Sequence, residues 1–300
     1  MGARLKVFLI FAVLWVVFIG IAYGLFYLLI YLGYLPPGSS YYTILMIMIP
    51  VLLLFNLVTY FYSDKMVLSA YNARIVTERE APKLARIVQK IATQAGLPMP
   101  RLAIVPSQTP NAFATGRDPE HAVVAVTEGT LSLLSDDELE GVLGHEMAHV
   151  LDRDILVMTV VSSAAAIISI VARIAIYQAM FGGRRQNVNP LVLLAAAITA
   201  PLAAMLIQLA VSRSREYKAD RQSAMITMKP LALARALSKL QTVNDRRPMQ
   251  FGHSSPAHSS LFIVNPFTGG FFVSLFSTHP PIKARIERLE RLADKQGYLQ

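Results

Sequence analysis

Four long runs of uncharged, mostly apolar residues constrain this chain more than any other feature. The first two cover residues 7–32 and 41–62, and each exceeds the roughly 20 residues that a helix needs to cross a hydrocarbon core of about 30 Å. Two more runs follow at residues 155–172 and 191–211. Because 54% of the chain is hydrophobic and 16% is charged, its composition is too apolar for an ordinary soluble domain. We therefore expect a membrane protein, mainly α, with two transmembrane helical hairpins.

The positive charges predict how these spans are oriented. Arg4 and Lys6 precede the first run, whereas the link at residues 33–40 has no Lys or Arg. The positive-inside rule then places the N-terminus and the main polar region in the cytoplasm. Arg184 and Arg185 oppose this orientation, but more basic residues lie on the inner side. For the second pair of runs, a buried hairpin in a soluble domain is the alternative.

The segments between the runs predict one catalytic domain that is split in the sequence. Residues 63–154 and 212–300 are polar, and together they are long enough for one compact domain. Residues 1–62 then form the N-terminal hairpin, and residues 155–211 form the second hairpin inside the catalytic domain. We expect this domain to be a zincin-like α+β fold with a small sheet.

Residues 145–149 read His-Glu-Met-Ala-His, the pattern of a zinc hydrolase. Two imidazoles one helical turn apart can reach one metal ion, and Glu146 between them can take a proton from water at the metal. Ser135 followed by Glu138 predicts a capping box that opens a helix over residues 136–152. The alternative is a helix whose histidines are hydrogen-bonded in the core, which would be costly to bury without a partner.

The third metal ligand is predicted at the end of the last apolar run. The chain has no cysteine, so thiolate ligands and disulfides are excluded. Glu216 and Asp220 share a helical face one turn apart, and a cation between them and a histidine would offset their repulsion. We assign Glu216 as third ligand of one Zn²⁺ per chain and Asp220 as the partner of a liganding imidazole. A solvated helix is the alternative, and cobalt or manganese would suit the same donors.

Two further patterns concern the helices around this site. Thr77 and Glu80 form a second capping-box pattern, which predicts a helix that ends near Gly96. Gly141 and Gly144 leave the turn before the first histidine slim enough for another backbone to approach.

Two short β-strands are predicted at residues 101–106 and 122–127. The second strand comes shortly before the metal helix. We expect it to be an exposed edge, where Val123, Val124 and Ala125 bind an extended peptide by backbone pairing. A place in the core of the sheet is the plainer role for these residues, and the two roles are compatible.

Taken together, the motifs resemble the HtpX family of integral-membrane zinc metalloproteases, which are related to the CAAX prenyl endopeptidases. The resemblance covers nearly the whole chain and rests on the HExxH motif, the first hairpin, Glu216-x-x-x-Asp220, Asn111-Ala-Phe-Ala-Thr-Gly116 and Ser277-Thr-His-Pro-Pro281. It implies proteolysis of misfolded or damaged membrane proteins during stress. It also implies that this occurs at the cytoplasmic face of a prokaryotic inner membrane.

The resemblance also implies roles for three residues that spacing alone leaves open. His279 would stabilise the oxyanion, although Thr278 and the prolines after it also suit a plain helix start. Arg285 would orient Glu216 or Asp220. Asn111 would hold the substrate backbone, and a turn residue after a proline is its alternative role.

Three other functions compete with this one. A site-2-type intramembrane protease is disfavoured because charged residues flank the HExxH motif. A prenyl endopeptidase shares the metal chemistry, but such enzymes have more transmembrane spans than the four predicted here. A zinc-binding scaffold without activity is the third, although Glu146 is present. Polypeptide substrates and the lipid bilayer are the expected partners, and the net charge of +9 comes with no nucleic-acid motif. Nothing in the sequence indicates an oligomeric state.

Overall fold

The computed structural model describes residues 40–158, 213–246 and 280–296, with scattered positions between residues 5 and 38. The chain divides into two compact units, Met1–Ser63 and Asp64–Gln300. The described elements are α2 (Tyr41–Ala70), β1 (Arg74–Val76), α3 (Pro82–Ala95), β2 (Arg101–Val105), β3 (Ala112–Thr115), the 3₁₀ turn η1 (Pro119–His121), β4 (Val123–Thr127), α4 (Glu128–Leu133), α5 (Asp136–Leu151), α8 (Arg213–Thr227), α9 (Pro230–Arg246) and α11 (Ile282–Gln296).

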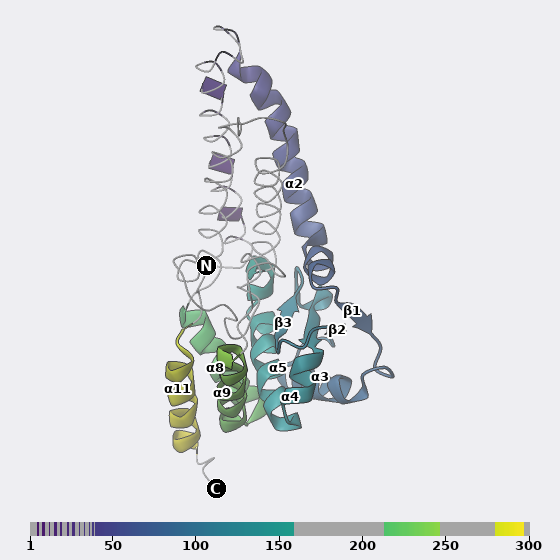
Figure 1. The fold of residues 1–300 in the computed structure, drawn as a ribbon, viewed down its shortest axis with the longest axis vertical. Coiled ribbons are helices and arrows are strands. Elements are labelled where there is room, and N and C mark those ends of the chain that lie inside the picture. The colour runs from purple at the N-terminus through teal and green to yellow at the C-terminus, as the bar shows by residue number, and fades with distance from the viewer. Residues whose placement is uncertain are drawn as a thin grey trace. The chain divides into compact units, whose positions relative to one another are not determined.

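A four-stranded sheet in the order β1-β2-β4-β3 organises the second unit. Figure 1 labels β1, β2 and β3 of this sheet. β1 runs antiparallel to β2, β2 parallel to β4, and β3 antiparallel to β4. Helices make up most of the rest of the described chain. The prediction of a mainly helical chain with a small sheet is therefore confirmed for the described residues.

The predicted edge strand is wrong. β4 pairs with β2 on one side and with β3 on the other, so it lies inside the sheet, and Val123, Val124 and Ala125 are fully buried. The physical reason is that β3, which the sequence analysis did not predict, adds to the outer side of β4. The sheet edge that faces α5 is β3.

Side chains alternate between the two faces of the sheet, and an apolar layer packs on each face. Val124 and Val126 point into the main core, which α3, α5, α9 and α11 complete. Val123 and Ala125 point to the other face, where they pack with Phe113 and with the C-terminal end of α2. β4 is thus buried on both faces, and this accounts for its continuous apolar sequence.

Local signals set the ends of α5 as predicted but failed for α3. Ser135 and Glu138 form the full capping box at the start of α5. In contrast, Glu80 accepts a hydrogen bond from the Thr77 amide at 2.7 Å within a turn, and α3 begins only at Pro82. Proline favours the first helical turn because it has no amide to satisfy, and this moves the helix start beyond the capping-box pattern. Gly96, with φ of 65°, ends α3 as predicted.

Two glycines bring α5 against its neighbours, as the sequence predicts. A Cβ at Gly141 would lie 2.9 Å from the Leu233 amide nitrogen, and one at Gly144 would lie 2.7 Å from Ser223 Oγ. The Ser223 hydroxyl donates to the Gly141 carbonyl at 2.7 Å. α8, which carries Glu216, is therefore fixed closely against the helix of the HExxH motif.

Gly144→Ala is expected to lower stability by about 1–3 kcal/mol, because overpacking forces α5 and α8 apart. The added methyl group would meet both Ser223 Oγ and Thr227 Cγ2 at 2.7 Å. Zinc affinity should fall together with stability, since the same contact sets the distance from Glu216 to the histidines. Thermal unfolding and zinc titration of the variant check this. Unchanged melting and unchanged zinc binding would show that the helix contact does not set the site.

The apolar runs lie largely outside the residues whose side chains are described. The second run is helical along its length within α2. Of the residues predicted to form the second hairpin, only 155–158 are described. Counting only the placed residues, we find no helix that is both long enough and apolar enough to span a bilayer.

Candidate metal centre

Helix α5 brings His145, Glu146 and His149 to one buried position. Their exposed fractions are 1%, 6% and 4%, and the two imidazole rings lie 4.9 Å apart between centroids at 88° to each other. The capping box and the acidic first turn of α5 stabilise the helix that sets this spacing. Both imidazoles thus lie on one face of α5 and are shielded from bulk water.

Glu216 on α8 completes a group of three donors. Its Oε2 lies 3.6 Å from His145 Nε2, and its Oε1 lies 3.5 Å from His149 Nε2. One ligand atom from each of the three residues lies within 4.8 Å of the others, and all three residues are buried. Two imidazole nitrogens and one carboxylate are a known donor set for catalytic zinc, which keeps a fourth position open. The residues therefore fit a zinc ion.

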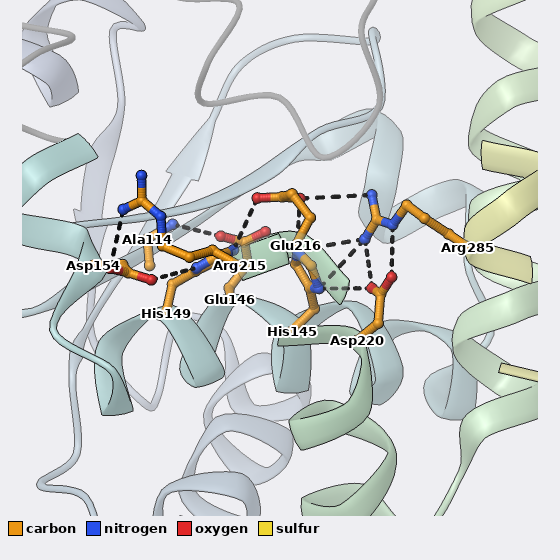
Figure 2. Close-up of polar contacts among 9 residues, drawn as sticks. All are labelled: Ala114, His145, Glu146, His149, Asp154, Arg215, Glu216, Asp220 and Arg285. Carbon is orange, nitrogen blue, oxygen red and sulfur yellow. Dashed lines mark hydrogen bonds and ion pairs between the residues drawn. The ribbon is translucent and has the colours of Figure 1, made fainter. Parts of the chain in front are cut away.

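Asp220 lies beside the Nδ1 atom of His145, and Arg285 lies within reach of both Asp220 and Glu216 (Figure 2). Asp220 Oδ1 is 3.0 Å from His145 Nδ1. Arg285 donates hydrogen bonds to both carboxylate oxygens of Asp220, at 2.9 and 2.7 Å. Arg285 is fully buried, and its Nη1 lies 3.9 Å from Glu216 Oε2. Burial raises the pKa of Asp220, but the Arg285 charge and the His145 hydrogen bond outweigh burial and lower it to about 2. Asp220 therefore stays ionised beside the imidazole.

Glu146 connects the metal-binding group to the edge of the sheet. Its Oε2 accepts a hydrogen bond from the Ala114 amide of β3 at 3.0 Å. Ala114 lies opposite Val124, and its amide points away from β4 toward α5. Burial raises the pKa of Glu146, although the two neighbouring imidazoles act in the opposite direction. A carboxyl group with a raised pKa can both accept and return a proton near neutral pH.

A second aspartate, which sequence reasoning missed, lies on the other imidazole. Asp154 Oδ2 is 4.0 Å from His149 Nδ1, and Asp154 Oδ1 is 3.1 Å from Arg215 Nη1. Burial raises the pKa of Asp154, but His149 and Arg215 together lower it below its ordinary value. The only signal in the sequence was its position five residues after His149. Residues five apart do not lie on the same face of a helix, so this spacing does not predict a contact.

The remaining predicted site residues are placed as follows. Asn111 is buried directly before β3, and its backbone amide donates to Thr127 Oγ1 at 2.9 Å. Its carbonyl accepts from the Thr130 hydroxyl at 2.8 Å. His279 lies outside the described residues. Its role as oxyanion stabiliser, like that of Asn111 at the substrate, stays a prediction.

Zinc binding is expected to release about one proton from His145 near pH 7.5. Burial and Arg285 act to lower the pKa of His145, but Asp220 and Glu216 outweigh them and raise it to about 9 in the metal-free site. The imidazole is then protonated at pH 7.5, and it must lose that proton to bind zinc. Apparent zinc affinity should therefore fall as the pH drops below about 9. Calorimetric titrations in buffers of different ionisation enthalpy measure this release.

Asp220→Asn is the matched variant for this measurement, because it removes one of the charges that hold the proton on His145. It should release fewer protons than the wild type. A binding heat that is the same in every buffer would contradict the protonated metal-free state.

The fold and the site define a class of protein: a metallohydrolase with two helix-borne histidines, a glutamate ligand and a glutamate base. Residues 78–293 match peptidase family M48, and the chain belongs to this family. It is 53% identical over 274 residues to a protease HtpX homolog of Thermococcus kodakarensis, covering 90% of this chain and 93% of that protein. A protease HtpX homolog of Pyrococcus furiosus is 51% identical over 275 residues, covering 91% and 93%.

A weaker likeness links the chain to the crystal structure of S. mikatae Ste24p. The two are 17% identical with a TM-score of 0.47, over 84% of this chain and 59% of that one. The family match and the HtpX homologs confirm the resemblance drawn from the motifs. The chain is a zinc metalloprotease, and His145, His149 and Glu216 form a group that could hold the ion.

Proposed function

We propose that this chain is a membrane-embedded zinc endopeptidase that cleaves extended segments of misfolded or damaged membrane proteins at the cytoplasmic face. One observation carries the proposal: Glu146 lies between the metal-binding group and the amide edge of β3. A general base, a metal site and a peptide-binding edge are thus within contact of one another. Metal-assisted hydrolysis uses a metal site and a general base, and a strand edge beside them can hold an extended substrate.

The side chains divide the reaction among them. His145, His149 and Glu216 would hold the ion, which when bound supplies Lewis acidity to water and to the peptide carbonyl. Glu146 takes the proton from the attacking water and passes it to the leaving amine. Asp220, fixed by Arg285, accepts a hydrogen bond from His145 Nδ1 and so leaves Nε2 free for the metal. His279 is proposed to stabilise the oxyanion.

The β3 edge supports a preference for extended substrates. Ala112 and Ala114 direct their backbone groups away from β4, and Glu146 accepts the hydrogen bond of the Ala114 amide. An extended peptide would add to this buried edge by backbone pairing in place of that contact. Asn111, just before β3, is proposed to hold the substrate backbone. A folded protein offers no free strand of this kind, so unfolded segments should be cleaved first. The choice of membrane proteins as substrates rests on the family resemblance.

Exposed apolar side chains on α2 support insertion in a bilayer. Met46, Leu54 and Leu57 are 77%, 62% and 56% exposed, on a helix that runs through the second uncharged segment. Lipid would cover such a surface, whereas water would leave a large apolar area unfavourably exposed. The distribution of Lys and Arg supports a cytoplasmic catalytic domain.

Substrate form is tested with one polypeptide in two states. Native α-lactalbumin and the same protein after reduction and carboxymethylation are incubated with the enzyme in detergent. We expect the unfolded form to be cleaved and the native form to resist. Equal cleavage of both forms would contradict recognition through the β3 edge, and cleavage of neither form would contradict a general endopeptidase.

Orientation is tested by cysteine labelling, because the chain has no cysteine of its own. Two single variants are made, Ser40→Cys and Gln94→Cys. Ser40 lies in the link between the first two runs, and Gln94 is exposed on α3. In right-side-out vesicles, a membrane-impermeant maleimide should label the first and not the second. Inverted vesicles should give the opposite result. The reverse pattern in both would place the catalytic domain outside the cell.

A further inference from the structure

The two imidazoles that face Glu216 each turn their other ring nitrogen toward a buried aspartate. His145 Nδ1 lies 3.0 Å from Asp220, and His149 Nδ1 lies 4.0 Å from Asp154. The first contact is a hydrogen bond, whereas the second is longer and acts through charge. Figure 2 shows the two aspartates on opposite sides of the site. The mechanism so far uses Asp220 and leaves Asp154 without a role.

A tight turn after α5 directs Asp154 back into the site. α5 ends at Leu151, and Arg153 adopts φ of 58°, the left-handed conformation that residues other than glycine rarely take. The Arg153 amide donates to the Val150 carbonyl at 3.0 Å, which closes the turn. Asp154 follows and is only 4% exposed. Helices commonly end in one left-handed residue, and here this turn places the Asp154 carboxylate in the buried site beside His149.

Arg215 holds Asp154 as Arg285 holds Asp220. Asp154 Oδ1 accepts a hydrogen bond from Arg215 Nη1 at 3.1 Å, and the other carboxylate oxygen of Asp154 faces His149. Arg215 directly precedes Glu216 on α8, so this contact joins the helix of the histidines to the helix of the glutamate. Each imidazole therefore has a carboxylate on its Nδ1 side and a guanidinium bound to that carboxylate, with closer contacts at His145 than at His149.

We propose that Asp154 is the positioning residue of His149. Its carboxylate favours the tautomer with the proton on Nδ1, so the Nε2 lone pair is free for the metal, and Arg215 keeps the carboxylate in place. The proposal rests on the zinc ligand set given under Proposed function. It adds a second residue outside that set on which zinc affinity depends.

The test compares Asp154→Ala and Asp154→Asn with Asp152→Asn, a matched control. Asp152 lies at the same end of α5 and also joins it to α8, through Lys218 at 2.6 Å and Gln222 at 3.2 Å, but it does not contact either imidazole. Zinc affinity is measured by competition with a chelator, and the visible spectrum is recorded on the cobalt-substituted proteins. Melting of the metal-free proteins reports packing separately.

Asp154→Ala is expected to weaken zinc binding roughly 10–100-fold and to shift the cobalt bands, with a smaller effect for Asp154→Asn. Asp152→Asn should stay within about twofold of wild type. Equal changes in affinity for the two positions, or a lower melting temperature with unchanged affinity and spectrum, would reduce Asp154 to a clamp between helices. If the wild type bound no zinc, or Glu216→Ala bound it equally well, the ligand set itself would be wrong and this proposal would fall with it.

Discussion

Glu146→Gln is expected to bind zinc as the wild type does and to lose peptidase activity by about 10²–10⁴-fold. Glu146 is not among the three donors that surround the metal position, so its charge is not needed for a ligand bond. In the wild type the Ala114 amide donates to Glu146 at 3.0 Å. A glutamine carbonyl can accept the same hydrogen bond, so the local structure should persist. What is lost is the ability to take a proton. Cleavage of unfolded casein in detergent, with zinc content measured on the same samples, records both effects.

Asp136→Asn is the control for this variant, because it removes an exposed carboxylate from the first turn of the same helix. Its activity should match that of the wild type. If Glu146→Gln kept substantial activity at full zinc content, another residue would have to be the base. If it lost zinc as well, its role would be in forming the site.

Glu216→Ala is expected to reduce zinc affinity by more than the roughly 10–100-fold typical of losing a residue that only supports a ligand. Glu216 is 1% exposed, and its two oxygens face the Nε2 atoms of both histidines. Its removal also leaves Arg285 with one carboxylate fewer nearby, since their closest atoms are 3.9 Å apart. Activity should then be restored only at high zinc concentration. Chelator competition and casein cleavage at increasing zinc measure the two effects.

Glu287→Ala serves as the control, since Glu287 is an exposed acid on α11. It should change neither zinc affinity nor cleavage. Wild-type affinity in Glu216→Ala would show that the third ligand comes from elsewhere in the chain.

Signals that act within one helix were readable from the sequence. The α5 capping box depends on residues three apart, and the HExxH spacing depends on the helical period alone, so both could be predicted from local pattern. Gly141 and Gly144 likewise indicated a close neighbour, although not which helix it would be. Glu216 followed from charge placement at the end of an apolar run.

Strand order could not be read in this way. β3 and β4 are both short and apolar, and which of them is the edge depends on pairing between distant segments. The sequence pattern therefore predicts an edge at Val123, Val124 and Ala125, whereas the edge on this side of the sheet is Ala112–Thr115. At Thr77 the capping pattern was present, but Pro82 offered a stronger helix start five residues later.

The support around the histidines depends on contacts between distant parts of the chain. Asp220 lay on a predicted helical face, so its pairing with an imidazole could be anticipated. The burial of Arg285 depends on α11 packing against α8 and α9, and only the family resemblance pointed to it. Asp154 was missed because a left-handed residue, which sequence patterns do not reveal, turns it back toward His149.

The central claim is that His145, His149 and Glu216 together hold one zinc ion that peptidase activity requires. It is tested most directly by adding zinc in steps to the metal-free protein while bound zinc and casein cleavage are measured together. We predict that cleavage is absent without metal, rises in proportion to bound zinc, and stops rising at one ion per chain. Full cleavage without metal, or a break at another ratio, would contradict the claim.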